Sequence, residues 1–104
     1  MKNEKTLEIV RIRPKTGVEV QHWLEVMDEV QSEFLEKQPG YLRRSLWRLD
    51  DESWVDLVEW RSREEADSAM EKSMDCEAVK KIGDMADMES MSVAHGKLAV
   101  SYGE

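Results

Sequence analysis

The first predicted strand carries apolar side chains on both of its faces, and this feature narrows the possible folds more than any other. Residues 6–13 are dense in β-branched residues. Leu7 and Ile9 fall on one alternating set of positions, and Val10 and Ile12 fall on the other. A strand that is apolar on both sides lies inside a sheet whose two faces are both covered. We therefore expect residues 6–13 to form a central strand.

A long amphipathic helix is predicted to follow this strand. Thr16 and Glu19 have the spacing of a capping box, in which each side chain binds a backbone N–H of the other residue, so the helix should begin near Val18. Apolar residues then recur every three or four positions over roughly twenty residues. Pro39 and Gly40 end the helix, because proline cannot continue the hydrogen-bond ladder and glycine accepts a positive φ.

The next segment has the pattern of a β-hairpin. Residues 41–49 and 53–60 both read as strands, and only a short polar stretch separates them. A connection of this length forces the two strands to run antiparallel.

A second helix is predicted after the hairpin. Ser62 and Glu65 repeat the capping-box spacing, and the helix should extend from there to about Ile82. Gly83 is the expected C-terminal stop. Residues 73–76 have weak helical character, so a break into two pieces stays open at that point.

Residues 91–102 read as the last strand, because apolar and β-branched residues dominate them. The order strand, helix, strand, strand, helix, strand is the split βαβ arrangement of a ferredoxin-like α+β domain, with two helices on one face of an antiparallel sheet. The 104 residues fit a single domain, whose core should span about residues 6–102.

The predicted sheet also has a face that its helices do not reach. Trp47 and Leu49 alternate with Leu42 and Leu46, so large apolar groups lie on both sides of the hairpin. At ~25 cal/mol per Å² of buried apolar area, leaving such groups in water would forfeit several kcal/mol. A two-fold partner is the simplest cover, and we expect a homodimer packed sheet against sheet.

Charge and composition exclude other classes of partner. The chain has 15 Lys and Arg against 23 Asp and Glu, and a net charge of −8 disfavours contact with nucleic acid. No apolar run approaches the ~20 residues of a membrane span. Residues 1–5 lack the apolar stretch of a secretion signal, and the single cysteine, Cys76, cannot form an internal disulfide. We expect a cytoplasmic protein with neither a nucleic-acid nor a membrane partner.

Three segments of the chain resemble the antibiotic biosynthesis monooxygenase family of dimeric α+β barrels. They are residues 38–42 (Gln-Pro-Gly-Tyr-Leu), 56–60 (Asp-Leu-Val-Glu-Trp) and 62–66 (Ser-Arg-Glu-Glu-Ala). The resemblance covers about residues 6–100 and implies the barrel fold and the dimer. It marks the barrel more securely than an activity, because the family includes enzymes and proteins with no known reaction.

The resemblance also implies an oxidoreductase that works without a cofactor. Family members that oxidise anthrones carry an asparagine and a tryptophan four residues apart on the third strand, and this spacing holds Asp56 and Trp60 here. Trp60 matches the family pattern, whereas Asp56 departs from it. An aromatic substrate that loses a proton becomes electron-rich enough to pass an electron directly to oxygen. The implied ligand is a small phenol, quinol or anthrone, with no flavin or metal.

The candidate site residues divide this chemistry among them. Asp56 would act as the base or as a polar anchor, and Trp60 would stack on the flat substrate. His22, beside the apolar stripe of the first helix, would shuttle protons. Further side chains expected to contact the substrate are Trp47, Trp54, Arg48 and Met70.

Other interpretations stay open from the residues alone. Asp56 could form a buried ion pair with Arg11 or Arg48, and Trp60 could simply fill the core. His95 has a weaker case than His22 and could lie at the dimer seam. The protein could also be a non-enzymatic barrel that binds an apolar ligand, or an isomerase or decarboxylase on the same fold. No metal site is expected, because no second histidine joins His22.

Overall fold

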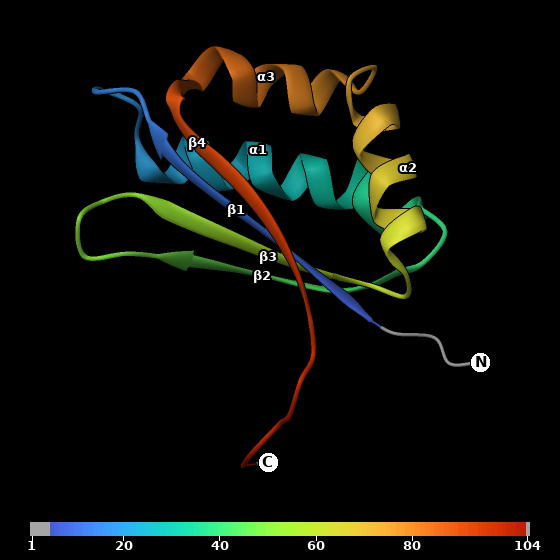
Figure 1. The fold of residues 1–104 in the computed structure, drawn as a ribbon. Helices are drawn as coiled ribbons and strands as arrows, with labels where there is room; N and C mark the ends of the chain where they lie inside the picture. The colour runs from blue at the N-terminus through green and yellow to red at the C-terminus, as the bar shows by residue number, and fades with distance from the viewer. Residues whose placement is uncertain (1–4, 104) are drawn as a thin grey trace.

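The computed structural model, which describes residues 5–103, is built on a four-stranded sheet with its helices on one side (Figure 1). The sheet order is β2-β3-β1-β4, and every neighbouring pair is antiparallel. The strands are β1 (Thr6–Pro14), β2 (Tyr41–Arg48), β3 (Trp54–Trp60) and β4 (Ala86–Lys97). The ferredoxin-like α+β fold is therefore confirmed, with β1 in a central position.

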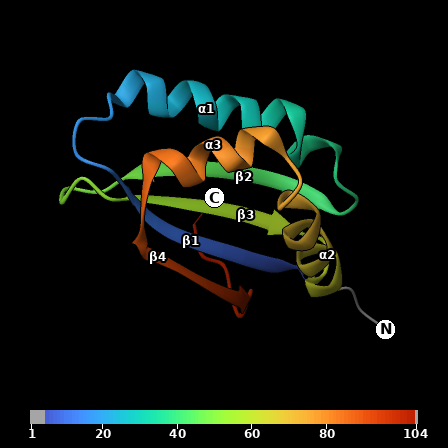
Figure 2. The ribbon, with the colours of Figure 1, turned by 90° about the horizontal axis from the view of Figure 1, so that it is seen from above.

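The helices form a layer above the sheet. They are α1 (Val20–Glu33), α2 (Arg63–Ser73) and α3 (Glu77–Met85), and a short 3₁₀ turn, η1 (Leu35–Lys37), follows α1. Seen from above, α1 and α3 lie side by side over the strands, and α2 lies at one end (Figure 2). Within residues 5–103, no helix has the length and hydropathy needed to cross a membrane.

The first helix begins later than the sequence pattern predicts. The predicted capping box between Thr16 and Glu19 is wrong: α1 starts at Val20, and the Glu19 side chain makes no capping hydrogen bond. Gly17 explains the delay, because its φ of 95° is a left-handed conformation that a right-handed helix cannot include.

The second predicted helix forms two helices, and the break falls at the weakly helical residues 73–76. Ser62 caps α2 as predicted, since its hydroxyl accepts a hydrogen bond from the Glu65 N–H at 3.2 Å. At the other end, the N–H groups of residues 74–76 donate to carbonyls three residues earlier, which tightens the last turn. The break lets α3 lie along α1 while α2 covers one end of the sheet (Figure 2).

The last strand begins earlier than predicted. The predictions that Gly83 ends the helix and that residues 91–102 form the strand are wrong, because α3 continues to Met85 and β4 follows at once. The β1–β4 ladder is irregular between Arg11 and Arg13: Arg11 pairs with Ser92 and Arg13 with Asp87, so the extra residues bulge from β4. The Arg13 N–H donates to the Ser90 hydroxyl in this bulge at 2.9 Å. Pairing with β1 thus makes a strand from a polar segment of low intrinsic β propensity.

The sheet face opposite the helices is uncovered in the single chain, and we call it the open face. Residues 98–103 leave β4 on this side and extend away from the sheet (Figure 1). Trp47 on this face is 59% exposed. The apolar residues of the open face are Leu7, Ile9, Trp47, Val55 and Leu57.

One corner of the molecule joins its two halves closely. Gly40, just before β2, has a φ of 85°, and a Cβ atom at this position would collide with the Glu65 side chain of α2. The Arg61 N–H donates to the Gly40 carbonyl at 2.8 Å. The turn that precedes β2 and the first turn of α2 therefore pack so closely that no side chain fits at position 40.

Candidate active site

A cavity of about 320 Å³ lies between the helices and the covered face of the sheet. Most of its wall is apolar, and its rim includes the exposed side chains of Met74 and Met88. Small-molecule sites typically measure about 300–1,000 Å³. The cavity is therefore large enough for a small ligand. Representative apolar lining residues are Val10, Ile12, Val30, Phe34, Leu35 and Met70.

A buried ion pair lies in the cavity wall. Arg44 donates from Nε to Asp56 Oδ1 at 2.9 Å and from Nη2 to Asp56 Oδ2 at 2.8 Å. The two side chains are only 6% and 17% exposed, and Arg44 Nη1 also donates to the Met27 carbonyl at 3.0 Å. Both carboxylate oxygens of Asp56 thus accept from one guanidinium, the strongest geometry for such a pair.

The ion-pair interpretation of Asp56 therefore holds, but with another partner than predicted. Arg11 and Arg48 were the expected partners, and this expectation is wrong. Arg11 binds Asp51 at 2.9 Å, and Arg48 pairs with Glu52 beside the hairpin turn. Arg44 and Asp56 lie on the helix-facing side of the sheet, whereas Arg11 lies on the other side and Arg48 lies at the hairpin end of β2.

Glu8 is a second carboxyl group in the cavity wall, and it has no cationic partner at contact distance among the described residues. It lies on β1, is 8% exposed, and its Oε1 accepts a hydrogen bond from Trp60 Nε1 at 2.8 Å. Burial raises the pKa of the Glu8 carboxyl above its ordinary value, while the Trp60 hydrogen bond and His95 oppose this shift. Glu8 is therefore easier to protonate than an exposed glutamate.

Trp60 is both a core residue and part of the cavity wall. It is almost fully buried, and its ring meets Tyr41 edge to face with centroids 6.2 Å apart. Its indole N–H is fully used by Glu8. Trp60 therefore fixes the orientation of Glu8 as well as filling the end of β3.

The structure brings three of the predicted site residues together and leaves His22 apart from them. Asp56, Trp60 and Met70 all line the cavity. His22 lies on the exposed side of α1, where its side chain is 60% exposed and its Nδ1 is 3.8 Å from Glu25 Oε1. It does not reach the cavity.

The other predicted contact residues also lie elsewhere. Trp47 is on the open face, and Arg48 is exposed near the hairpin turn. Trp54 lines a separate recess of about 210 Å³. These three side chains do not contribute to the cavity wall.

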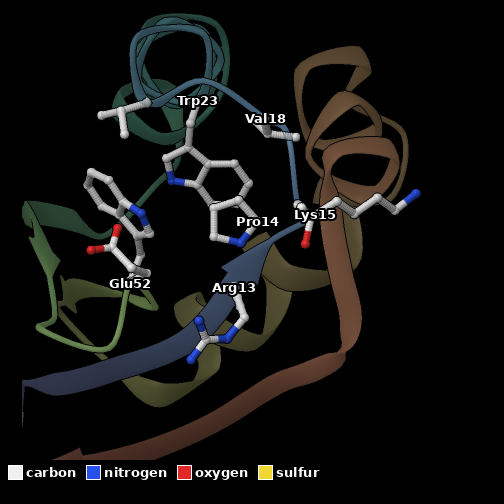
Figure 3. Close-up of a pocket in the computed structure, with 9 residues that line it drawn as sticks. Arg13, Pro14, Lys15, Val18, Trp23 and Glu52 are labelled. Atoms are coloured by element: carbon white, nitrogen blue, oxygen red, sulfur yellow. The ribbon is translucent and has the colours of Figure 1, made fainter.

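The separate recess lies where the end of β1 approaches the start of α1 (Figure 3). Arg13 and Lys15 lie on its wall together with Trp23, whose ring centroid is 6.4 Å from that of Trp54. Trp23 Nε1 is buried and has no hydrogen-bond partner among residues 5–103. The same residues contain no cluster of three His, Cys, Asp or Glu side chains that could hold a metal ion.

Two charged residues of the cavity, Glu8 and Arg44, were not among the predicted site residues. Glu8 is in phase with Val10 and Ile12 on β1, and Arg44 is in phase with Leu46 on β2, so each lies on the helix-facing side. Their place in the alternation of each strand, on the same side as neighbouring apolar residues, is the signal that could have identified them. The partner of Glu8, Trp60, lies 52 positions later in the chain, so no local pattern reveals the pairing.

The sequence matches the family model described as antibiotic biosynthesis monooxygenase over residues 7–81, which is well over half of the chain. No curated protein matches the chain.

Several solved structures share this fold. A protein from Bordetella bronchiseptica and one from Nitrosomonas europaea, both named after the same family, superpose with TM-scores of 0.78 and 0.77. The Bordetella protein is 17% identical to this chain, and the alignment covers 93% of this chain and 99% of that protein. The Nitrosomonas protein is 15% identical, and the alignment covers 99% of this chain and 98% of that protein. SnoaB, a cofactor-independent oxygenase from Streptomyces nogalater, gives a TM-score of 0.67 at 16% identity, and the alignment covers 98% of this chain and 97% of SnoaB.

Proposed function

Because the chain belongs to the antibiotic biosynthesis monooxygenase family, we propose that it is a cofactor-independent monooxygenase that oxidises a small electron-rich aromatic compound with molecular oxygen. One observation carries the proposal: the cavity of about 320 Å³ has apolar walls, and the charged side chains among its lining residues are Glu8, Arg44 and Asp56. An apolar wall suits a flat aromatic ligand. The few charged groups suit control of its protonation.

The chemistry needs no external reductant. A substrate that loses a proton becomes an electron-rich anion, which passes an electron to oxygen. For an anthrone, the ring CH₂ group becomes a carbonyl: one oxygen atom enters the product, the other leaves as water, and the substrate supplies every electron. The protein contributes a dry aromatic-lined cavity and a group that takes the first proton.

The cavity residues have distinct parts in this reaction. Trp60 and Met70 form the surface against which the ring packs. The Arg44–Asp56 pair acts as the polar anchor, because it places two charged groups in the cavity wall while staying neutral overall.

The working unit in this proposal is a homodimer joined through the open face. All the helices of the described chain lie on the other side of the sheet, so its apolar residues have no cover within one chain (Figure 1). A second copy would bury them by two-fold symmetry.

Oxygen uptake with a panel of anthrones and quinols tests the function. We expect uptake by the parent protein and a loss of about tenfold or more in Trp60→Phe, equivalent to ~1.4 kcal/mol in the barrier. Asp56→Asn should also lose activity, although it leaves Arg44 without its partner. In the double variant Arg44→Gln/Asp56→Asn no unpaired charge is left buried, so it separates a loss of activity from a loss of stability. Glu71→Gln, on the exposed side of α2, is the control.

The outcomes distinguish the alternatives. Uptake that is insensitive to Trp60→Phe and Asp56→Asn would remove these residues from the site. Binding of the aromatic compounds without any oxygen consumption would favour the ligand-binding barrel instead.

A further inference from the structure

We propose that Glu8 is the group that takes the proton from the bound aromatic compound. The inference rests on the proposed function, and it assigns to Glu8 the role of base that the sequence pattern offered to Asp56. Asp56 is poorly suited to it, because Arg44 holds both of its oxygens at 2.8 to 2.9 Å. A base must have an oxygen that can reach the substrate proton.

The position of Glu8 in the sheet supports this role. In the β1–β3 ladder, Glu8 pairs with Val58, which lies between Asp56 and Trp60 on the same face of the sheet. Its side chain therefore lies in the middle of the wall that carries the other polar groups of the cavity. Trp60 holds Oε1 at 2.8 Å, and no side chain of residues 5–103 donates to Oε2. Glu8 lines the cavity, so an oxygen of its carboxyl group that no described side chain occupies is left for a ligand.

The surroundings of Glu8 strengthen it as a base. Its burial raises the pKa of the carboxyl, and the negative charges of Asp56 on β3 and Asp67 on α2 raise it further. The Trp60 hydrogen bond and His95, opposite Glu8 on β4, lower the pKa. Burial is the largest of these effects. An ionised Glu8 therefore binds a proton more strongly than an exposed glutamate does.

The step is a simple proton transfer. The O–H bond of a phenol, or the acidic C–H bond of an anthrone, breaks and leaves its electron pair on the aromatic compound. The proton forms a new bond to Glu8 Oε2. One negative charge moves from Glu8 to the substrate, so the net charge within the cavity does not change, and no further ion is desolvated.

The test isolates this step from oxygen chemistry. Under anaerobic conditions, para-nitrophenol is titrated with protein below its own pKa, and the visible absorption of its anion is followed. We expect the parent and Glu71→Gln to bind the phenol as the anion. Glu8→Gln, which keeps an acceptor for the Trp60 N–H, should bind it neutral, and Glu8→Asp should restore part of the anion signal.

Steady-state rates give the second measurement. With an anthrone that the parent oxidises, Glu8→Gln should lower kcat by about 10²-fold or more with little change in KM, as for loss of a general base. The limb of the parent pH profile that rises with Glu8 ionisation should also disappear. An anion signal that is equal in Glu8→Gln and the parent, or a parent that binds the phenol neutral or not at all, would overturn the inference. A parent that ionises the phenol but consumes no oxygen contradicts the proposed function alone.

Discussion

Glu8 is an acid that the fold buries beside an indole, and this placement links stability to pH. The folded-state pKa of Glu8 is raised above its ordinary value of 4.5, chiefly by burial. Between pH 4.5 and the raised folded-state pKa, the native protein therefore binds more protons than the unfolded chain. The contribution of Glu8 to stability is complete below pH 4.5 and is lost as pH rises through the raised folded-state pKa.

Glu8→Gln should therefore stabilise the protein at alkaline pH, because glutamine stays neutral and still accepts from Trp60. The gain in unfolding free energy should be about 1.4 kcal/mol for each unit by which the pKa of Glu8 is raised. Urea unfolding near pH 8 and near pH 4.5, compared with Glu71→Gln, measures the difference. A change that is equal at both pH values would contradict the burial effect.

Individual side chains show where the sequence was informative about the site. The four-residue spacing of Asp56 and Trp60 correctly placed both on one face of β3, and both line the cavity. The identity of their partners could not be predicted, because Arg44 and Glu8 come from other strands and pair only through the register of the sheet. His22 shows the opposite case, since its place beside the apolar stripe leaves it on the exposed side of α1.

At the level of elements, the N-terminus of α2 depends on its cap. Ser62 accepts a hydrogen bond from the Glu65 N–H at 3.2 Å and donates to Glu65 Oε1 at 3.1 Å. Ser62→Ala should lower the free energy of unfolding by about 1 kcal/mol. Thermal or urea unfolding measures this loss. Thr16→Ala is the matched control, because Thr16 does not cap α1, and an equal loss in both variants would argue against the cap.

The β2–β3 turn depends on Asp51. Its Oδ1 accepts from the Ser53 hydroxyl at 2.6 Å and from the Ser53 N–H at 3.0 Å, and these bonds lower the pKa of Asp51 from 3.8 to about 2. The stabilisation is thus present above pH 3.8 and is lost as pH falls towards 2. Asp51→Ala should lower Tm at neutral pH, and this difference should shrink with acid. Asp50→Ala is the control, and a pH-independent difference would refute the turn's role.

The boundaries of the elements were harder to predict than their order. A positive φ at Gly17 delays α1 although the capping-box residues are present, and successive tight hydrogen bonds at residues 74–76 divide the second helix. The segment that begins at Ala86 becomes a strand because β1 offers it an unpaired edge. Tertiary pairing of this kind overrides local propensity, and only the whole sheet reveals it.

At the scale of the whole molecule, the open face should hold two copies together. Trp47→Glu and Leu57→Glu would each bury a charge within this contact, so we expect the dimer dissociation constant to rise by about 10²-fold or more. Sedimentation at micromolar concentration measures the shift from dimer to monomer. Leu24→Glu, on the exposed side of α1, is the control. A parent chain that sediments as a monomer would contradict the sheet-to-sheet dimer.

The corner at Gly40 has a consequence for reassembly. Its two sides belong to different halves of the sequence, since Gly40 precedes β2 whereas Arg61 and Glu65 follow β3. A chain nicked in the β2–β3 turn would leave one side on each fragment. The Glu65 carboxylate fills the space that a Cβ atom at position 40 would need, so the two fragments could rebuild this corner only with glycine at that position.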